Sequence, residues 1–180
     1  AGGGKSFGLL LSPLRYKNVK GFGCTIFRRN FNQIFAQGGL WDESQKVYQG
    51  IKGASPQMSL GRWKFCDKDG RIVSTVKFAH IEREEDLAKW QGSQICEIGF
   101  DELTHFNLEE YEYLISRNRP NGPGMLCYMR ATANPGGIGH GWVKDRFVTR
   151  GEPMKPFVNE LEVELPDGSR KKLVKISKYA

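Results

Sequence analysis

The first six residues contain three consecutive glycines followed by a lysine and a serine. They match the last six positions of the eight-residue pattern G-x-x-x-x-G-K-[ST], whose first glycine would lie before the chain begins. Gly2, Gly3 and Gly4 would let backbone N–H groups approach phosphate oxygens. Lys5 would place a positive charge on the β- and γ-phosphates, and the Ser6 hydroxyl would bind Mg²⁺. The segment therefore predicts a phosphate-binding loop, with a flexible glycine-rich terminus as the alternative.

A short apolar strand at residues 95–100 is followed by two consecutive carboxylates, Asp101 and Glu102. A site that hydrolyses a magnesium–nucleotide complex needs such groups beside its phosphate loop. Asp101 would hold Mg²⁺, directly or through water, and Glu102 would polarise the water that attacks the γ-phosphate. A solvated turn or a helix cap is the alternative for this pair alone. Together with the glycine-rich start, the pair favours the catalytic interpretation.

A third candidate segment, Thr132-Ala133-Asn134, directly follows an apolar strand at residues 125–129. Its hydroxyl and amide would lie at the same sheet edge, within reach of the γ-phosphate, where they could sense its presence. The sequence Asn-Pro-Gly-Gly at residues 134–137 is also strong turn chemistry. A plain turn and a phosphate sensor are compatible here.

The elements that position these residues alternate between helices and strands. A helix from Ser6 to about Tyr16 would carry the phosphate loop at its N-terminus, where an anion is favoured, and Pro13 would kink it. Further strands are expected at 21–27, 63–66, 72–78, 95–100 and 125–129, and further helices at 31–35, 81–90, 107–117 and 141–149, the helix at 107–117 capped by Asn107. Residues 36–62 read as a glycine-rich, polar stretch. The pattern predicts an α/β domain with a largely parallel sheet, a hairpin at 63–78 and a closing hairpin at 158–176.

The composition sets limits on the class of protein. The chain has 180 residues, of which 39% are hydrophobic and 26% charged, which argues against wholesale disorder and favours one domain with at most a small appendage. The formal charge of +7 favours a polyanionic partner such as nucleic acid. No apolar run approaches membrane-spanning length. The histidines and cysteines lack metal-ligand spacing, so we expect free thiols in a reducing compartment: Cys24, Cys66, Cys96 and Cys127.

Taken together, these segments resemble the ATPase domain of the large terminase subunit, the motor that packages DNA in tailed phages. The matching segments occur in the expected order over roughly residues 1–150: 2–6, 26–29, 78–80 with 82–86, 90–93, 99–104 and 130–147. The stretch from Asn134 to Lys144 is the most specific of them.

The resemblance implies a P-loop NTPase, a three-layer sandwich of the additional-strand, catalytic-Glu (RecA-like) type, with its first strand missing from this sequence. It implies ATP and Mg²⁺ as cofactors, Lys5 and Glu102 as catalytic residues, Ser6 and Asp101 as metal ligands, and Thr132-Ala133-Asn134 as the segment that couples hydrolysis to DNA movement. Residues 1–150 would form the ATPase domain, and residues 151–180 a closing hairpin or the start of a linker to a nuclease domain. Nuclease activity is not expected in this fragment, which we expect to be cut from a longer chain.

The same resemblance implies double-stranded DNA, the portal protein and the small terminase subunit as partners, a homo-oligomeric ring, no membrane association, and the host cytoplasm with transient residence at the procapsid portal. The alternatives are another DNA-stimulated P-loop ATPase, of helicase or recombinase type, and a nucleotide-binding or docking module without turnover. The residues leave open which arginine serves as an arginine finger, the candidates being Arg28, Arg29, Arg83, Arg117 and Arg119. Basic residues at 17–29 and 170–172 are candidate DNA contacts or plain surface charges, and the four tryptophans favour packing over base stacking.

Overall fold

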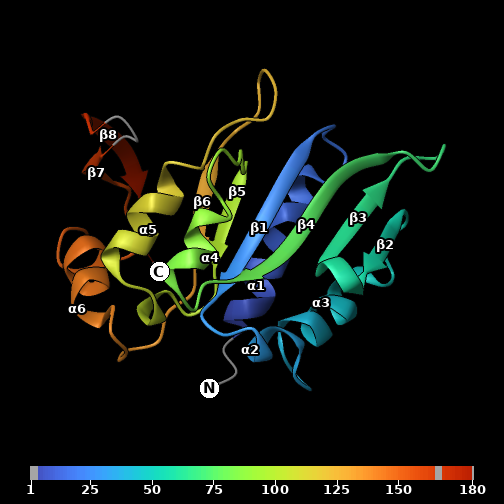
Figure 1. The fold of residues 1–180 in the computed structure, drawn as a ribbon, viewed down its shortest axis with the longest axis horizontal. Helices are drawn as coiled ribbons and strands as arrows, with labels where there is room; N and C mark the ends of the chain where they lie inside the picture. The colour runs from blue at the N-terminus through green and yellow to red at the C-terminus, as the bar shows by residue number, and fades with distance from the viewer. Residues whose placement is uncertain (1–3, 165–167, 180) are drawn as a thin grey trace. The chain divides into compact units, whose positions relative to one another are not determined.

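The computed structural model describes residues 4–164 and 168–179. The chain divides into two compact units (Figure 1). The first unit comprises residues 1–102 and 117–133, and the second comprises residues 103–116 and 134–180. The chain therefore passes from one unit to the other directly after Glu102 and again directly after Ala133. The predicted division at residue 150 stays a prediction.

A six-stranded sheet forms the centre of the first unit, in the order β2-β3-β4-β1-β5-β6 (Figure 1). The strands are β1 (Phe22–Arg28), β2 (Ala54–Gln57), β3 (Arg62–Cys66), β4 (Ile72–His80), β5 (Glu97–Phe100) and β6 (Tyr128–Ala131). β4, β1, β5 and β6 run parallel, whereas β2 and β3 are added antiparallel at one edge. The predicted α/β class, the mostly parallel sheet and the antiparallel hairpin at residues 63–78 are confirmed.

Short helices connect these strands: α1 (Lys5–Leu11), α2 (Asn32–Phe35), α3 (Leu40–Tyr48), α4 (Glu84–Ala88) and the 3-10 turns η1 (Ser12–Tyr16) and η2 (Met58–Leu60). The predicted first helix changes from α to 3-10 geometry at Ser12, and Pro13 lies in the first turn of η1. A proline is tolerated in a first turn because the N–H that it lacks has no helical partner there. The expected kink is thus a change of helix type.

The prediction for residues 36–62 was wrong, because this stretch contains both α3 and β2. The buried residues of α3 recur on one face, at Leu40, Trp41, Ser44 and Tyr48, between polar neighbours. Trp41 stacks on Trp63 of β3 with ring centroids 5.9 Å apart. The glycines before α3 and its short length conceal this periodicity in the sequence, and the helix is stabilised by packing on the sheet.

The core of the first unit lies between α1, α3 and one face of the sheet. It contains Leu9, Leu10, Phe22, Cys24, Ile26, Ile34, Leu40, Trp41, Tyr48, Trp63, Phe65, Val76, Phe78 and Cys96. The Tyr48 hydroxyl donates to the carbonyl of Leu10 at 2.7 Å, which ties α3 to α1. The free thiols of Cys24 and Cys96 are buried, while those of Cys66 and Cys127 are half-buried.

The second unit contains η3 (Leu103–His105), α5 (Leu108–Ile115), α6 (His140–Val143), the π-helical turn η4 (Lys144–Val148) and a hairpin of β7 (Phe157–Glu164) and β8 (Arg170–Ser177). The predicted cap of α5 is confirmed, because Asn107 Oδ1 accepts from the N–H of Glu110 at 2.8 Å. Glu110 Oε2 accepts from the N–H of Asn107 at 2.9 Å, which completes a capping box. No helix in the described part of the chain has the length and apolarity needed to cross a membrane.

Candidate functional site

Three segments that are far apart in the sequence meet at the C-terminal ends of β5 and β6. Lys5 and Ser6 form the first turn of α1, Asp101 directly follows β5, and Thr132 directly follows β6. β5 and β6 are parallel neighbours, with Phe100 opposite Ala131, so the residues that follow them lie side by side. This is the edge at which open parallel sheets bind ligands.

The Asp101 carboxylate is the centre of this cluster and is only 1% exposed. Its Oδ1 atom accepts from the Ser6 hydroxyl at 3.0 Å and from the Thr132 hydroxyl at 2.8 Å. Its Oδ2 atom has no hydrogen bond among the described residues and lies 3.4 Å from Arg28 Nε. Oδ2 is thus paired with the Arg28 guanidinium, which balances the charge of this buried carboxylate, and a metal ion bound by Asp101 would share or replace that contact.

Arg28, one of the five candidates for an arginine finger, contacts this cluster through Asp101, and which arginine serves as the finger stays open. It ends β1, and its backbone neighbour Phe27 is paired with Phe100 of β5, so Arg28 and Asp101 leave adjacent strands together. Its NH1 group donates to the carbonyl of Gln33 at 3.3 Å, which holds the guanidinium in place. Nothing in the spacing of residues 28 and 101 reveals this pairing, because it depends on which strands are neighbours.

Glu102 has a left-handed backbone, with φ at +62°. For a residue with a Cβ this conformation costs about 1–3 kcal/mol, and such strain gathers at functional sites. The N–H of Glu102 donates to the Thr132 hydroxyl at 3.0 Å. The Thr132 hydroxyl therefore contacts Asp101 with its proton and Glu102 with its oxygen.

The predicted phosphate-loop lysine also reaches the segment after β6. Lys5 Nζ donates to the carbonyl of Ala133 at 2.9 Å. Gly4 has φ at +66°, and its carbonyl accepts from the N–H of Gly8 at 2.8 Å, which starts α1. Gly2 and Gly3 lie outside the described residues.

The structure thus brings together Lys5, Ser6, Asp101, Thr132 and Ala133, with Glu102 bonded to Thr132. Asn134 belongs to the second unit, where its carbonyl accepts from the Thr104 hydroxyl at 2.9 Å. The role of its amide stays a prediction.

The glycines after Asn134 are needed for packing within the second unit. A Cβ on Gly137 would lie 2.5 Å from the carbonyl oxygen of Thr104, and one on Gly139 would lie 2.3 Å from that of Phe106. Gly139 also donates its N–H to the carbonyl of Thr104 at 2.8 Å. The loop after Thr132-Ala133 therefore packs closely on the turn that follows Asp101-Glu102. A turn with no packing role would not need glycine at both positions.

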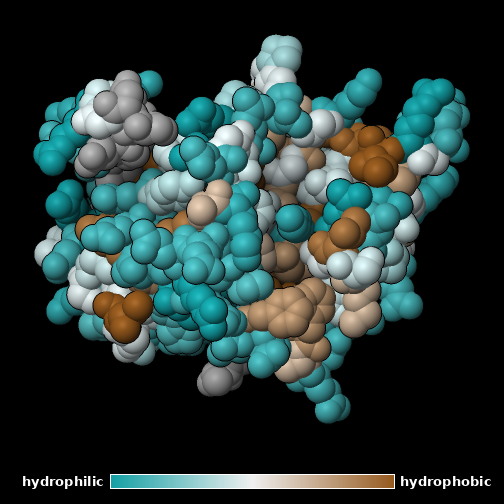
Figure 2. Space-filling view, viewed as in Figure 1, coloured by the Kyte–Doolittle hydropathy of each residue, from teal (hydrophilic) through white to brown (hydrophobic). Residues whose placement is uncertain are grey.

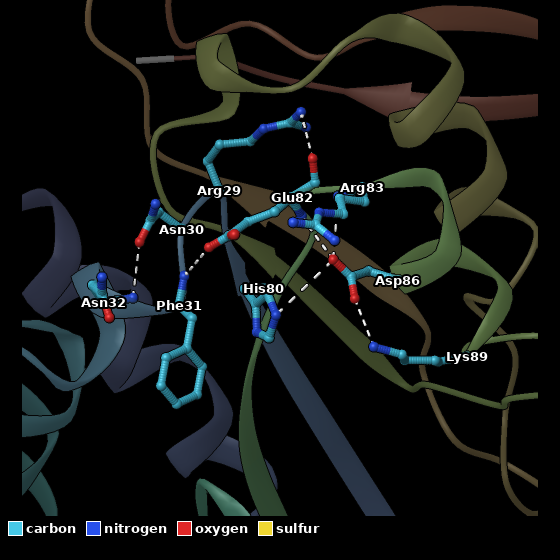
Figure 3. A network of polar contacts seen from close by, with 9 residues as sticks. All are labelled: Arg29, Asn30, Phe31, Asn32, His80, Glu82, Arg83, Asp86 and Lys89. Atoms are coloured by element: carbon cyan, nitrogen blue, oxygen red, sulfur yellow. Dashed lines mark hydrogen bonds and ion pairs between the residues drawn. The ribbon is translucent and has the colours of Figure 1, made fainter.

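A second polar network lies at the C-terminal ends of β1 and β4 (Figure 3). It includes residues from the segment 78–93, which contributes to the resemblance described above. The Asp86 carboxylate accepts from Lys89 Nζ at 2.7 Å and from the N–H groups of Glu82 and Arg83 at 3.1 and 3.2 Å. The hydrogen bond from Lys89, with help from those N–H groups, lowers the pKa of Asp86 to about 2. Glu82 Oε1 accepts from the N–H of Phe31 at 2.7 Å, so the network joins the loops after β1 and β4.

This network borders a hollow of about 850 Å³ that is lined largely by aromatic and aliphatic side chains from α2, η2, β4 and the segment from α4 to Ser93. The C-terminal half of β4, residues 77–80, lines this hollow, and the lining contains none of the residues that cluster around Asp101. Residues 78–93 therefore form much of the wall of this hollow in the first unit.

A third cluster lies at the opposite ends of α1, β5 and β6. Glu97, at the start of β5, is fully buried, and its Oε2 atom accepts from the Tyr128 hydroxyl at 2.7 Å. The Tyr128 and Ser12 hydroxyls are 3.4 Å apart. Burial raises the pKa of Glu97, although hydrogen bonds from Ser12 and Tyr128 oppose that effect. The three elements that carry the candidate site are thus joined by a carboxylate and hydroxyls at both ends.

The donor atoms around Asp101 fit Mg²⁺ better than a transition metal. They are hydroxyl and carboxylate oxygens, and Mg²⁺ is commonly held by one or two carboxylates together with phosphates and water. Within residues 4–164 and 168–179 there is no group of three histidine, cysteine or acidic side chains that could hold a metal ion. Of the basic residues near the C-terminus, Lys172 pairs with Glu160 at 2.7 Å and Arg170 lies 4.0 Å from Glu162.

Comparisons with known proteins identify the family of the chain and a similar fold. Residues 1–137 match the family described as terminase large subunit, T4likevirus-type, N-terminal. The fold is similar to the crystal structure of the large terminase from a thermophilic bacteriophage, with a TM-score of 0.64 and 11% sequence identity over 82% of this chain. The chain spans 35% of that structure's length. A search of curated proteins found no match. The family match covers most of the chain, and the chain belongs to the terminase large subunit family.

Proposed function

We propose that the first unit binds Mg²⁺-ATP and hydrolyses it, and that it is a P-loop ATPase of the RecA-like type. The observation that carries the proposal is the convergence of Lys5, Ser6, Asp101 and Thr132, through hydrogen bonds of 2.8–3.0 Å, at one edge of a parallel sheet. The N-terminus of α1 offers N–H groups and a positive dipole end to the same place.

Each side chain has a distinct task in this proposal. Lys5, which now donates to the Ala133 carbonyl, would contact the phosphates of a bound nucleotide. The Ser6 hydroxyl and Asp101 would hold Mg²⁺, which would neutralise phosphate charge. Glu102 orients the attacking water and accepts its proton. Thr132 holds Asp101 and the backbone of Glu102 in register, so both carboxylates depend on one hydroxyl.

The exchange of Lys5 between Ala133 and the phosphates supplies a route to coupling. Ala133 is the last residue of the first unit, and Asn134 begins a loop that packs on the turn after Glu102. A phosphate that attracts Lys5 releases the Ala133 carbonyl, so the state of the nucleotide is passed to the chain that enters the second unit. In other nucleotide-dependent switches, too, contacts to the γ-phosphate hold a segment that is released when the phosphate leaves.

We further propose that hydrolysis drives translocation of double-stranded DNA into a viral procapsid. Membership of the terminase large subunit family and the formal charge of +7 support this. The portal protein, the small terminase subunit, a homo-oligomeric ring and the host cytoplasm belong to the same proposal.

The test is a steady-state phosphate-release assay on the full-length protein, with and without long duplex DNA. Wild type should turn over ATP faster when DNA is added, and Lys5→Ala should abolish turnover with and without DNA. Turnover that ignores DNA would instead indicate a generic P-loop ATPase. Nucleotide binding without any turnover in wild type would indicate a docking module and would contradict the proposal.

A further inference from the structure

The outer face of the antiparallel edge of the sheet is basic. Side chains alternate between the two faces of a strand, and the inward residues Trp63, Phe65 and Val76 are buried in the core. The residues between them point the other way and include Arg62, Lys64 and Lys77, of which Lys77 is exposed and the other two are half-buried. Helices α1 and α3 pack on the core face of the sheet, and the opposite face of β2, β3 and β4 is turned to the viewer (Figure 1). On that opposite face, η2 and Trp90 line a hollow together with Lys77.

The charges on this face are of one sign. β2, β3 and β4 together contain Arg62, Lys64 and Lys77 and no aspartate or glutamate, in a chain with 27 basic and 20 acidic residues. Arg62 and Lys77 are directly opposite each other in the β3–β4 ladder. Like charges in that position oppose sheet formation, and a face needed only for solubility would mix both signs. The arrangement therefore indicates a negatively charged partner.

Neutral hydrogen-bonding groups complete the surface. Thr75 is opposite Lys64, Ser55 is opposite Lys64 on the other side, and Gln57 is opposite Arg62. Hydroxyl and amide groups of this kind commonly contact the sugar and phosphate of DNA. The space-filling view shows hydrophilic residues beside hydrophobic patches over these strands (Figure 2).

Two of the three cations are held in place by neighbours. Arg62 Nε donates to Gln57 Oε1 at 2.6 Å, which leaves the other guanidinium nitrogens directed away from that bond. Lys77 Nζ lies 4.9 Å from the centre of the Trp90 ring, a cation–π contact. Fixed cations lose less conformational entropy on binding than free lysine side chains do.

We propose that this surface, the basic strand face (Ser55, Gln57, Arg62, Lys64, Thr75 and Lys77), binds the sugar–phosphate backbone of duplex DNA. Arg62 and Lys64 are two apart on β3, so their side chains point to the same side of the sheet and can contact one DNA strand together. Contacts to the backbone carry no sequence information, which is what a protein that moves along DNA requires.

The proposal rests on the proposed function for its choice of partner, but the surface is separate from the hydrolysis site. β4 and β1 stand between β3 and β5 in the sheet, and none of the six residues contacts Asp101 in the described structure. Changes on the basic strand face should therefore leave basal ATP turnover intact.

The test compares a triple variant, Arg62→Gln, Lys64→Gln and Lys77→Gln, with wild type in the full-length protein. Fluorescence anisotropy of a labelled 30-base-pair duplex gives the affinity at salt concentrations from 50 to 300 mM. Each lost phosphate contact lowers the slope of log affinity against log salt by about 0.9, so three lost contacts lower it by about 2.7. This corresponds to about 500-fold weaker binding at 0.1 M salt, provided that binding at 1 M salt is unchanged.

A matched control removes the same charge from exposed positions elsewhere, by Lys46→Gln, Lys52→Gln and Lys155→Gln. The slope of log affinity against log salt for the control should differ from the wild-type slope by less than about 0.9, the value for one phosphate contact. Both triple variants should keep the wild-type melting temperature and basal ATP turnover. Equal slopes for the two triple variants would overturn the proposal. Displacement of the duplex by polyglutamate as readily as by unlabelled DNA would also overturn it, because the partner would then be an acidic protein. Absence of ATP turnover in wild type would count against the proposed function and leaves the binding slopes interpretable.

Discussion

The Thr132 hydroxyl is the atom on which both acidic residues of the site depend, so Thr132→Val is the sharpest single perturbation. Valine has nearly the shape of threonine and lacks only the hydroxyl. The change removes the donor 2.8 Å from Asp101 Oδ1 and the acceptor 3.0 Å from the N–H of Glu102. Thr132 is 8% exposed and Asp101 is 1% exposed, so water does not readily replace either bond.

The cost follows from those two bonds. A hydrogen bond to a buried carboxylate contributes about 1.5–3 kcal/mol, and a buried N–H without a partner costs about 1–3 kcal/mol. With partial relaxation of the left-handed Glu102, we expect the free energy of unfolding to fall by about 2–4 kcal/mol. ATP turnover should fall at least about tenfold, because a displacement equivalent to about 1.4 kcal/mol in the transition state is enough for that loss.

Thr132→Ser is the matched control, because it keeps the hydroxyl and loses only a methyl group, at a cost of about 1 kcal/mol. Urea unfolding followed by tryptophan fluorescence measures stability, and phosphate release measures turnover. If the valine and serine variants have the same stability and the same turnover, the hydroxyl does not position the two carboxylates and this reasoning is refuted.

Three further predictions concern other parts of the chain. Tyr128→Phe removes the hydroxyl that donates to buried Glu97 and should lower the free energy of unfolding by about 1–3 kcal/mol at pH 7. The loss should be smaller at pH 4, where Glu97 is more protonated, and a loss that does not depend on pH would contradict this prediction. The pKa of Asp86 is lowered to about 2, so its ionised form stabilises the fold above pH 4 and that contribution is lost as pH falls towards 2. Asp86→Asn should therefore destabilise by about 1 kcal/mol at pH 7, after allowance for solvent screening, and the difference from wild type should vanish near pH 2 in acid-unfolding curves. Gly139→Ala should lower the melting temperature because its Cβ would lie 2.3 Å from a backbone oxygen, whereas Gly141→Ala, with open space around it, should not; equal melting temperatures would contradict the packing.

The sequence was informative where chemistry and local pattern coincide. Consecutive carboxylates at a strand end predicted Asp101 beside the start of α1, and Asn107 predicted a helix cap that the structure confirms. These features depend on residues that are close together in the chain or on the general rule that parallel strands end at one edge.

The parts that could not be predicted depend on contacts between distant residues. The contact between Arg28 and Asp101 could not be predicted, because it depends on the pairing of β1 with β5. Helix α3 was missed because its buried face is stabilised by packing on Trp63 and is flanked by glycines. The pairing of Glu97 with Tyr128 could not be predicted either, because it requires that β5 and β6 be neighbours.

The central claim is that Glu102 activates the attacking water in a site formed by Lys5, Ser6 and Asp101. A single-turnover experiment with radiolabelled Mg²⁺-ATP on Glu102→Gln tests it most directly, since glutamine keeps the size of the side chain but cannot accept the proton. We expect the variant to bind ATP within a few-fold of the wild-type affinity and to cleave it at least about a thousandfold more slowly. Cleavage by Glu102→Gln at the wild-type rate would contradict the account.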